Sequence, residues 1–411
     1  MGETVAPSPQ NDLGTKRQKR RRRGNAANAA GKSRKNAAHV AADPMVNGGD
    51  VAAEIGKSTA RDGGPAKPNN GAKTNQNRNA KSNWVGRTAY AALDLGTNNC
   101  RLLIAREGGD GFTVVDAFSR VVRLGEGLTS TGRMSEEAMD RAVEALSVCA
   151  DKLKRRNVSL ARSVATEACR QAVNGAQFIE RVRLETGIML DIISPQEEAR
   201  LAVMGCHALL EKGEGPALIF DIGGGSTELV LVSTDGIVPA ILDWISVPWG
   251  VVSLTESEAF DQEDAAARTA GYAAMRGKVR ASFAAFEARL PANGGDRRLL
   301  GTSGTVTTLA SVHLGLPHYD RRQVDGLHLP SSAMREISQN LANLPPAGRA
   351  AFPTIGTERA DLVVAGCAIL EAILDIWPGE RLGIADRGIR EGILRALMAS
   401  DAKKKKQGAR S

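Results

Sequence analysis

Hydrophobic and polar positions change their spacing repeatedly along the chain, and each change predicts a new element. Residues 88–107, TAYAALDLGTNNCRLLIARE, carry two short apolar runs around a polar turn, which is typical of two strands joined by a tight connection. Residues 111–124 continue this β pattern. The same strand–turn–strand pattern returns in residues 216–232, PALIFDIGGGSTELVLV, and we expect further strands within 163–170, 190–194 and 298–307.

Helix signals separate these strands. Ser135 is a favourable N-cap followed by two glutamates, and the pattern predicts a helix that continues to about Arg155. Ser194, with Pro195 in the first turn, predicts the start of another helix. Further helices are expected around residues 256–290.

One more helix start is predicted between these segments. Asn174 and Gln177 have the spacing of a capping box, which predicts a helix that runs through Glu185. Because helices and strands are interleaved along the whole chain, the sequence predicts an α/β fold.

The charge of the 411-residue chain is unevenly distributed. Residues 1–87 contain 17 Lys and Arg against 6 Asp and Glu, a net charge of +11, and almost no large apolar residues. The remaining residues contain 37 basic and 40 acidic side chains, so the folded part has a net charge of −3 and no overall basic field. The basic block KRQKRRRRG at residues 16–24 predicts either a weak contact with RNA or another polyanion, or only a solvated tail.

The domain organisation follows from these patterns. We predict a disordered basic tail over residues 1–87, a first α/β domain over 88–212, a second over 213–400 and a basic tail over 401–411.

Cysteine usage and hydropathy indicate a cytoplasmic protein. The chain has five cysteines with no C-x-x-C pair, which is typical of reduced, mostly buried thiols and not of a disulfide framework or zinc site. No apolar run approaches the ~18 residues of a transmembrane helix. The N-terminus lacks the apolar segment of a secretory signal.

An internal repeat brings the two predicted domains together. DLGTNNCRLLI (94–104) and DIGGGSTELVL (221–231) align without a gap at an offset of 127 residues. Both have an acid, an aliphatic residue, a glycine, a polar turn and a second strand. The repeat predicts two similar domains that face each other, each with a hairpin turn at the cleft between them.

The residue types in these turns are typical of phosphate binding. Glycine lets backbone amides approach a phosphate, and consecutive amides in a turn form an anion-binding nest. The hydroxyls of Thr97, Ser226 and Thr227 can add donors, and Asp94 and Asp221 could hold Mg²⁺. The alternative is that the glycines only permit tight hairpins and the acids cap turns. Two such hairpins favour binding.

The ordered motifs resemble a known superfamily. DLGTNNCRLLIA, DIGGGSTELVLV, GTSGTVTTLA and ADRGIREGIL follow the order of the phosphate, third-loop and connecting motifs of the actin, sugar-kinase and heat-shock-protein superfamily. With ATEACRQA and SPQEEARL they are more closely similar to the exopolyphosphatase / guanosine pentaphosphate phosphohydrolase (Ppx/GppA) family, over about residues 88–394. The resemblance implies two ribonuclease-H-like domains flanking a cleft, with the last helix crossing back to the first domain. It also implies a homodimer.

The same resemblance implies an activity and a set of site residues. The activity is Mg²⁺-dependent hydrolysis of terminal phosphate from inorganic polyphosphate, guanosine pentaphosphate or both. Glu198 takes the place of the catalytic glutamate, Arg170 of a phosphate-contacting arginine, Asp221 of a Mg²⁺-associated aspartate and Glu228 of the phosphate-loop glutamate. The other implied site residues are Asp94, Gly96, Thr97, Asn98, Gly223, Gly224, Gly225, Ser226, Thr227, Ser303 and Arg359.

The two adjacent glutamates of SPQEEARL have separate interpretations. Glu197 lies three residues after the cap Ser194, which predicts a capping-box role. Glu198 is turned by about 100° around the same helix and can face the cleft. A carboxylate there is a suitable base for an attacking water, while Mg²⁺ and amide donors offset the phosphate charge.

Two departures leave alternatives open. Longer members of the family carry an extra C-terminal helical region that this sequence does not show, so we expect short polyphosphate or guanosine pentaphosphate to be favoured over very long polyphosphate. The first rival function is an ATP-using kinase or ATPase of the same superfamily. The second is a catalytically weak sensor that binds polyphosphate or an alarmone while its tail holds RNA.

Overall fold

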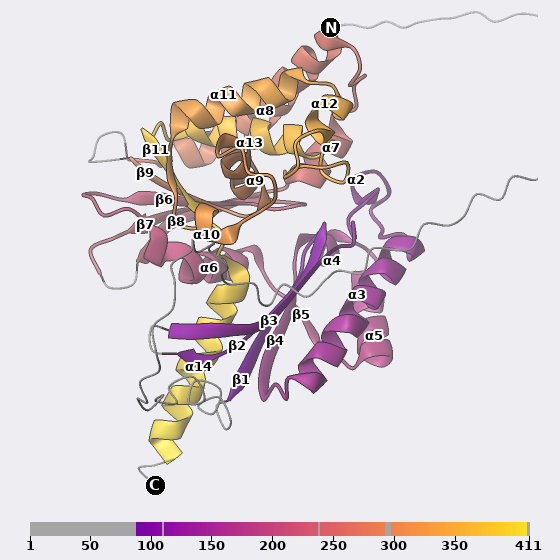
Figure 1. Ribbon diagram of the computed structural model, residues 1–411, viewed down its shortest axis with the longest axis vertical. Helices are drawn as coiled ribbons and strands as arrows, with labels where there is room; N and C mark the ends of the chain where they lie inside the picture. The colour runs from indigo at the N-terminus through magenta and orange to yellow at the C-terminus, as the bar shows by residue number, and fades with distance from the viewer. Residues whose placement is uncertain (1–87, 109–110, 237–238, 292–296, 409–411) are drawn as a thin grey trace, which may run out of the picture. The chain divides into compact units, whose positions relative to one another are not determined.

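The computed structural model describes residues 88–108, 111–236, 239–291 and 297–408, all within one compact unit that spans residues 75–411. The predicted basic tail of residues 1–87 lies outside the described residues. Figure 1 shows two β-sheets, each with its own helices.

The first sheet has the strand order β3-β2-β1-β4-β5. Its first three strands form an antiparallel meander, and β4 and β5 then continue the sheet in parallel with β1. The central strand β1 is almost entirely buried because helices cover both faces of the sheet. The strands are β1 (Ala89–Leu95), β2 (Asn99–Gly108), β3 (Gly111–Val121), β4 (Leu160–Ala165) and β5 (Leu190–Ile192).

The second sheet repeats this connectivity. Its order is β10-β11-β9-β6-β7-β8, in which β6, β7 and β8 form the meander and β9 and β11 continue in parallel. The short β10 pairs antiparallel to β11 at the edge. The predicted fold class, two ribonuclease-H-like α/β domains, is therefore confirmed. The strands are β6 (Ala217–Ile222), β7 (Thr227–Ser233), β8 (Ala240–Val247), β9 (Arg298–Thr302), β10 (His328–Pro330) and β11 (Arg381–Ala385).

The helices begin largely where their caps predict. The Ser135 hydroxyl accepts from the Ala138 amide at 3.2 Å, which starts α3 as expected. The Ser194 hydroxyl accepts from the Glu197 amide at 3.2 Å at the start of α6. The helices are α2 (Leu128–Thr131), α3 (Glu136–Arg155), α4 (Glu167–Gln171), α5 (Gly175–Thr186), α6 (Pro195–Cys206), α7 (Val251–Ser257), α8 (Ala265–Glu287), α9 (Gly304–His313), α10 (Arg321–Val324), α11 (Ser331–Asn343), α12 (Pro346–Ala350), α13 (Val363–Ile376) and α14 (Ile389–Gly408).

Two local predictions were wrong. Asn174 precedes α5 but does not cap it with its side chain. Its buried side-chain amide instead accepts from Met134 N at 3.0 Å and donates to Met134 O at 2.9 Å. Because the bond from Met134 N uses the side-chain oxygen, that oxygen does not accept from an amide of the first turn of α5. Lys403–Lys406 were assigned to a tail, yet they lie within the last turns of α14.

The last helix crosses back to the first sheet, as the resemblance implied. Ile393 and Leu394 of α14 are fully buried against Tyr90 and Leu103 of the first sheet and Leu201 of α6. In Figure 1 the yellow α14 runs along β1 and β2. The helix that carries Glu198 thus packs against the C-terminal helix and, through Ala199 and Val203, against the second sheet.

The helix crossing is close enough to require glycine. A Cβ on Gly205 of α6 would lie 2.0 Å from the Gly388 carbonyl oxygen, and one on Gly392 of α14 would lie 2.0 Å from the Leu201 carbonyl oxygen. No real Cβ tolerates such a contact, so these glycines set the distance between α6 and α14.

The thiols agree with the sequence prediction. All five cysteines are free and buried, and the Sγ atoms of Cys100 and Cys149 lie 4.0 Å apart. No helix in the described ranges is long and apolar enough to cross a membrane.

Candidate active site

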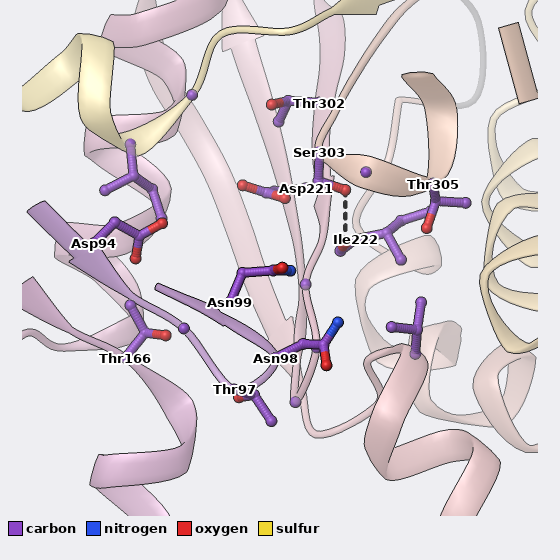
Figure 2. A pocket seen from close by; sticks show the side chains of 18 of the residues that line it. Asp94, Thr97, Asn98, Asn99, Thr166, Asp221, Ile222, Thr302, Ser303 and Thr305 are labelled. Carbon is purple, nitrogen blue, oxygen red and sulfur yellow. Dashed lines mark hydrogen bonds between the residues drawn. The ribbon is translucent and has the colours of Figure 1, made fainter. Parts of the chain in front are cut away.

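A pocket between the two sheets collects most of the predicted site residues. The turns of the two repeated hairpins both line it, and Figure 2 shows Asp94 of β1 and Thr166, which follows β4, across from Asp221 of β6 and Ser303, which follows β9. The predicted residues that line it are Asp94, Gly96, Thr97, Asn98, Glu198, Asp221, Gly223, Gly224, Gly225, Ser226, Glu228, Ser303 and Arg359.

The two hairpins share a backbone hydrogen bond across the turn but differ in the charges they pair across the ladder. The Gly96 amide donates to Asn99 O at 2.9 Å, and the Gly223 amide donates to Ser226 O at the same distance. Asp94 on β1 stands directly across the ladder from Arg101 on β2.

At the equivalent place in the second hairpin, Asp221 on β6 stands across from Glu228 on β7. One hairpin thus places an acidic and a basic residue across the ladder, and the other places two carboxylates on one face.

Burial and repulsion from neighbouring carboxylates disfavour the ionised forms of Asp221 and Glu228 in the pocket. Burial and then the neighbouring Asp94 carboxylate raise the pKa of Asp221 to about 6. Burial and then Asp221 raise the pKa of Glu228 to about 7, although Ser226 and Ser246 each donate to its Oε1 at 2.8 Å. Bringing a cation or a positive dipole close to this side would relieve the repulsion.

Asp94 is balanced differently. Burial raises its pKa, and the guanidinium groups of Arg101 and Arg390 oppose that rise. Burial lowers the pKa of Arg390, which lines the pocket from the start of α14. One oxygen of Asp94, Oδ1, is buried without a hydrogen-bond partner in the described structure.

Glu198 lies in the first turn of α6 and is 8% exposed. Its Oε2 accepts from Nη1 and Nη2 of Arg170, both at 3.1 Å. Among the described residues its Oε1 has no hydrogen-bond partner, and the side chain lines the pocket. Burial and then the nearby Glu228 hold the pKa of Glu198 well above its ordinary value, while Arg170 acts in the opposite direction.

Two predicted residues are placed behind the pocket wall. Arg170 is not part of the lining, because its guanidinium is held by Glu198, Glu167 and the Ile193 carbonyl oxygen. The hydroxyl of Thr227 donates to the Trp249 carbonyl oxygen at 2.6 Å, away from the pocket.

Glu197 was assigned to a capping box, and that prediction was wrong. Its carboxylate accepts from Arg162 at 2.8 Å and from Arg200 at 2.7 Å, so it forms ion pairs on the outer side of α6. Two guanidinium partners stabilise a carboxylate more than one backbone amide does, and they hold the pKa of Glu197 at about 2.

The second glycine turn is braced from behind. The amides of Val251 and Val252 at the start of α7 donate to the carbonyl oxygens of Gly223 and Gly224 at 2.9 and 2.8 Å. The amides of Gly224 and Gly225 have no acceptor among the described residues, and both glycines line the pocket. Free amides in a braced turn form a preorganised anion site.

These glycines are also required by close contact between the sheets. A Cβ on Gly224 would lie 2.9 Å from Cβ of Thr97 and 3.2 Å from the Asn98 amide nitrogen. A Cβ on Gly225 would lie 2.7 Å from Oγ1 of Thr97. Glycine therefore serves both the free amides and the approach of the first hairpin.

The third loop enters the pocket with an unusual backbone. Ser303 precedes α9 with φ of 87°, a conformation that L residues rarely adopt, and its hydroxyl donates to the Ile222 carbonyl oxygen at 2.6 Å (Figure 2). This bond ties the loop to the end of β6. Arg359 reaches the same side, with Nη1 3.5 Å from Oγ1 of Thr308.

The acidic groups suit a divalent cation held mainly by water and phosphate. The described residues contain no group of three or more His, Cys, Asp or Glu side chains placed to hold a metal. Mg²⁺ is commonly bound through one or two carboxylates while its other ligands are waters and substrate phosphates. The unpartnered Oδ1 of Asp94 and the repelled carboxylate of Asp221 fit that role.

Sequence reasoning missed several pocket residues that were nonetheless inside its motifs. Arg101 closes the first hairpin motif, Glu167 lies in ATEACRQA, and Arg387 and Arg390 lie in ADRGIREGIL. The signal for Arg101 was its position seven residues after Asp94, which the repeat matches to Glu228 seven residues after Asp221. The others depend on packing between distant elements.

Comparison with known proteins gives a consistent result. The sequence model of the Ppx/GppA phosphatase family matches residues 103–401. Exopolyphosphatase 2 of Mycobacterium tuberculosis is 30% identical over 328 residues, covering 75% of this chain and 98% of that protein. A guanosine-5'-triphosphate,3'-diphosphate pyrophosphatase of Aeromonas hydrophila is 29% identical over 318 residues, covering 76% of this chain and 60% of the relative.

Solved structures agree with the fold. The crystal structure of the Aquifex aeolicus member of the Ppx/GppA family has a TM-score of 0.62 and 26% identity, covering 76% of this chain and 98% of that chain.

Proposed function

The chain belongs to the Ppx/GppA phosphatase family, and from this premise we propose that it is a Mg²⁺-dependent hydrolase that releases terminal phosphate from inorganic polyphosphate, guanosine pentaphosphate or both. The relatives named exopolyphosphatase and guanosine-5'-triphosphate,3'-diphosphate pyrophosphatase support the two substrate classes. Both substrates end in a phosphoanhydride, so one site can serve both.

One observation carries the proposal. Glu198 has one oxygen fixed by Arg170 and the other without a hydrogen-bond partner among the described residues, and it lines the same pocket as a braced turn with free amides at Gly224 and Gly225. A carboxylate base and an anion-binding turn in one pocket are two parts that phosphoanhydride hydrolysis needs.

The step follows from these positions. Glu198 accepts a proton from a water molecule, and that water oxygen forms a new bond to the terminal phosphorus. The anhydride P–O bond on the opposite side breaks, so inorganic phosphate and the shortened chain leave. The amides of Gly224 and Gly225 donate to the non-bridging oxygens that gain charge, while the hydroxyl of Ser226 donates to Glu228 behind them. A Mg²⁺ ion held by Asp94 and Asp221 would neutralise phosphate oxygens.

The raised pKa of Glu198 suits this role. A base whose pKa lies nearer to the working pH takes up the proton of water more readily than an ordinary glutamate does. Arg170 opposes this rise, because its positive charge favours the ionised carboxylate.

The proposal is tested by phosphate release from the purified protein with Mg²⁺, offering polyphosphate of defined lengths and guanosine pentaphosphate side by side. We expect release from at least one substrate, and a loss of about 10²-fold or more in Glu198→Gln, the scale of general-base catalysis. Glu185→Gln, on an exposed part of α5, serves as the matched control.

The two rival functions have distinct outcomes. If wild type and Glu198→Gln both bind polyphosphate and guanosine pentaphosphate but release no phosphate from either, the protein is a sensor and not a hydrolase. Transfer of phosphate from ATP to an acceptor would replace it with a kinase.

A further inference from the structure

Glu167 is an acidic residue of the pocket to which the proposed chemistry gives no role. It begins α4, its side chain is 13% exposed and it lines the pocket. Three residues later, Arg170 donates to it from Nε at 2.8 Å and also from Nη2. Gln171 donates to the other oxygen of the same carboxylate. Both oxygens of Glu167 are therefore occupied by its own helix.

Arg170 is saturated by this arrangement. Nε and Nη2 face Glu167, Nη1 donates to the Ile193 carbonyl oxygen at 2.6 Å, and Nη1 and Nη2 both face Oε2 of Glu198. A guanidinium has five N–H donors in a rigid plane, so fixing one edge fixes the direction of the other. Because Glu167 holds Nε and Nη2 of Arg170, it fixes the plane of the guanidinium group and so the direction from which Nη1 and Nη2 reach Glu198.

Glu167 also contacts the other domain. A Cβ on Gly225 would lie 3.0 Å from Cγ and 3.2 Å from Cβ of Glu167, so the glutamate stem packs directly on the second glycine turn. The same residue thus touches the proposed anion-binding turn and, through Arg170, the proposed base Glu198.

We propose that Glu167 is a positioning residue, which holds Arg170 in the orientation that fixes Oε2 of Glu198 and couples that orientation to the place of the glycine turn. It does not touch the reacting atoms. This inference rests on the proposed function, since it assigns a role within that site.

The role predicts a specific pattern of kinetic effects. Glu167→Ala frees Nε of Arg170 and opens space beside Gly225, so Glu198 loses its fixed direction. We expect kcat to fall about tenfold or more with KM changed less than about threefold, because a misplaced catalytic group costs rate and not ground-state binding. Glu167→Gln keeps an oxygen acceptor for Arg170 at the same length, and we expect it to restore kcat to within about threefold of wild type.

The chain offers a matched control. Glu180 and Arg183 on α5 also form an i,i+3 ion pair through Nε and Nη2, at 2.8 and 2.6 Å, on an exposed surface. Glu180→Ala removes an equivalent ion pair without touching the pocket, and we expect unchanged kcat and KM.

A second readout does not need turnover. Phenylglyoxal modifies guanidinium groups that are free to react, and mass spectrometry of the digested protein resolves the rate at Arg170. We expect slow modification of Arg170 in wild type and Glu167→Gln, and several-fold faster modification in Glu167→Ala. If Glu167→Ala fails to fold, judged by its thermal melt, Glu167→Asp shortens the tether by one methylene and carries the same expectation.

The outcomes separate this inference from the proposed function. Wild-type kcat in Glu167→Ala, equal losses in the Ala and Gln variants, or a change confined to KM would overturn the positioning role while the hydrolase stands. If wild type releases no phosphate from either substrate, the proposed function fails, and the labelling rates alone decide whether Glu167 holds Arg170.

Discussion

Asp221 and Glu228 stand directly opposite each other on β6 and β7, so two carboxylates share one face of a single β-ladder at the pocket. Like charges in this position oppose folding. The equivalent pair in the first hairpin is Asp94 and Arg101, where the charges attract. The second hairpin therefore keeps an electrostatic cost that the first avoids, as expected where charge serves a ligand and not the fold.

The first prediction concerns pH and stability. Because the folded-state pKa of Glu228 is raised from 4.5 to about 7, the folded protein binds more protons than the unfolded chain in that interval. The contribution of Glu228 to stability is present below pH 4.5 and is lost as the pH rises through about 7. We expect the melting temperature without divalent cations to fall over this interval.

Glu228→Gln isolates the cause. The amide oxygen can still accept from Ser226 and Ser246, so the variant removes charge while keeping those bonds. We expect its melting temperature at pH 8 to exceed that of wild type by on the order of 2 °C per kcal/mol relieved, with little difference at acid pH. Scanning calorimetry checks this, and parallel pH curves for the two proteins would contradict it.

A second prediction concerns Mg²⁺ without substrate. If Asp94 and Asp221 share the cation, adding Mg²⁺ at pH 8 raises the melting temperature of wild type, since a ligand that binds only the folded state stabilises it. Asp94→Asn and Asp221→Asn should each lose most of that increase. Asp140→Asn, an exposed aspartate of α3, should keep it. An undiminished increase in both pocket variants would place the cation elsewhere.

A third prediction tests the brace behind the glycine turn. A Cβ on Gly250 would lie 2.3 Å from Gly224 C and 2.5 Å from Gly225 N, and backbone atoms there cannot move without displacing the turn. We expect Gly250→Ala to cost about 1–3 kcal/mol of stability, the usual range for overpacking, and to weaken phosphate release. Urea unfolding and a release assay measure the two effects.

The control for Gly250→Ala is a glycine-to-alanine substitution that we expect to raise stability. Gly277 lies exposed in α8, where an added Cβ meets nothing within 4 Å. Gly277→Ala should stabilise the protein by about 0.5–1 kcal/mol, since alanine favours a helix interior over glycine. Equal effects of the two substitutions would show that the brace is not rigid.

A fourth prediction concerns the crossing of α6 and α14. Gly392→Ala would place a Cβ 2.0 Å from the Leu201 carbonyl oxygen and so push the helices apart. We expect the free energy of unfolding to fall by about 1–3 kcal/mol, the usual range for overpacking. Since α6 carries Glu198 and the first turn of α14 carries Arg390, we also expect phosphate release to be reduced well below the melting temperature. Ser400→Ala, exposed near the end of α14, should leave both unchanged. Lost stability with full activity would separate the crossing from the site.

The sequence by itself determined the features that depend on neighbours along the chain. The repeated hairpins, the caps Ser135 and Ser194 and the helical phase that turns Glu198 toward the pocket all follow from local spacing, and the structure has each of them. The repeat also predicted two domains, because each hairpin of this pattern opens its own α/β segment, and each of the two sheets contains one such hairpin. These conclusions needed no knowledge of packing.

Only the tertiary structure decided which polar groups meet across the chain. Asn174 binds Met134 instead of capping its helix, and Glu197 turns to arginines outside the site. Glu167 meets Gly225 only because two domains close on each other. A side chain with several possible partners takes the set that satisfies it best, and partners far along the chain are brought within reach only by packing.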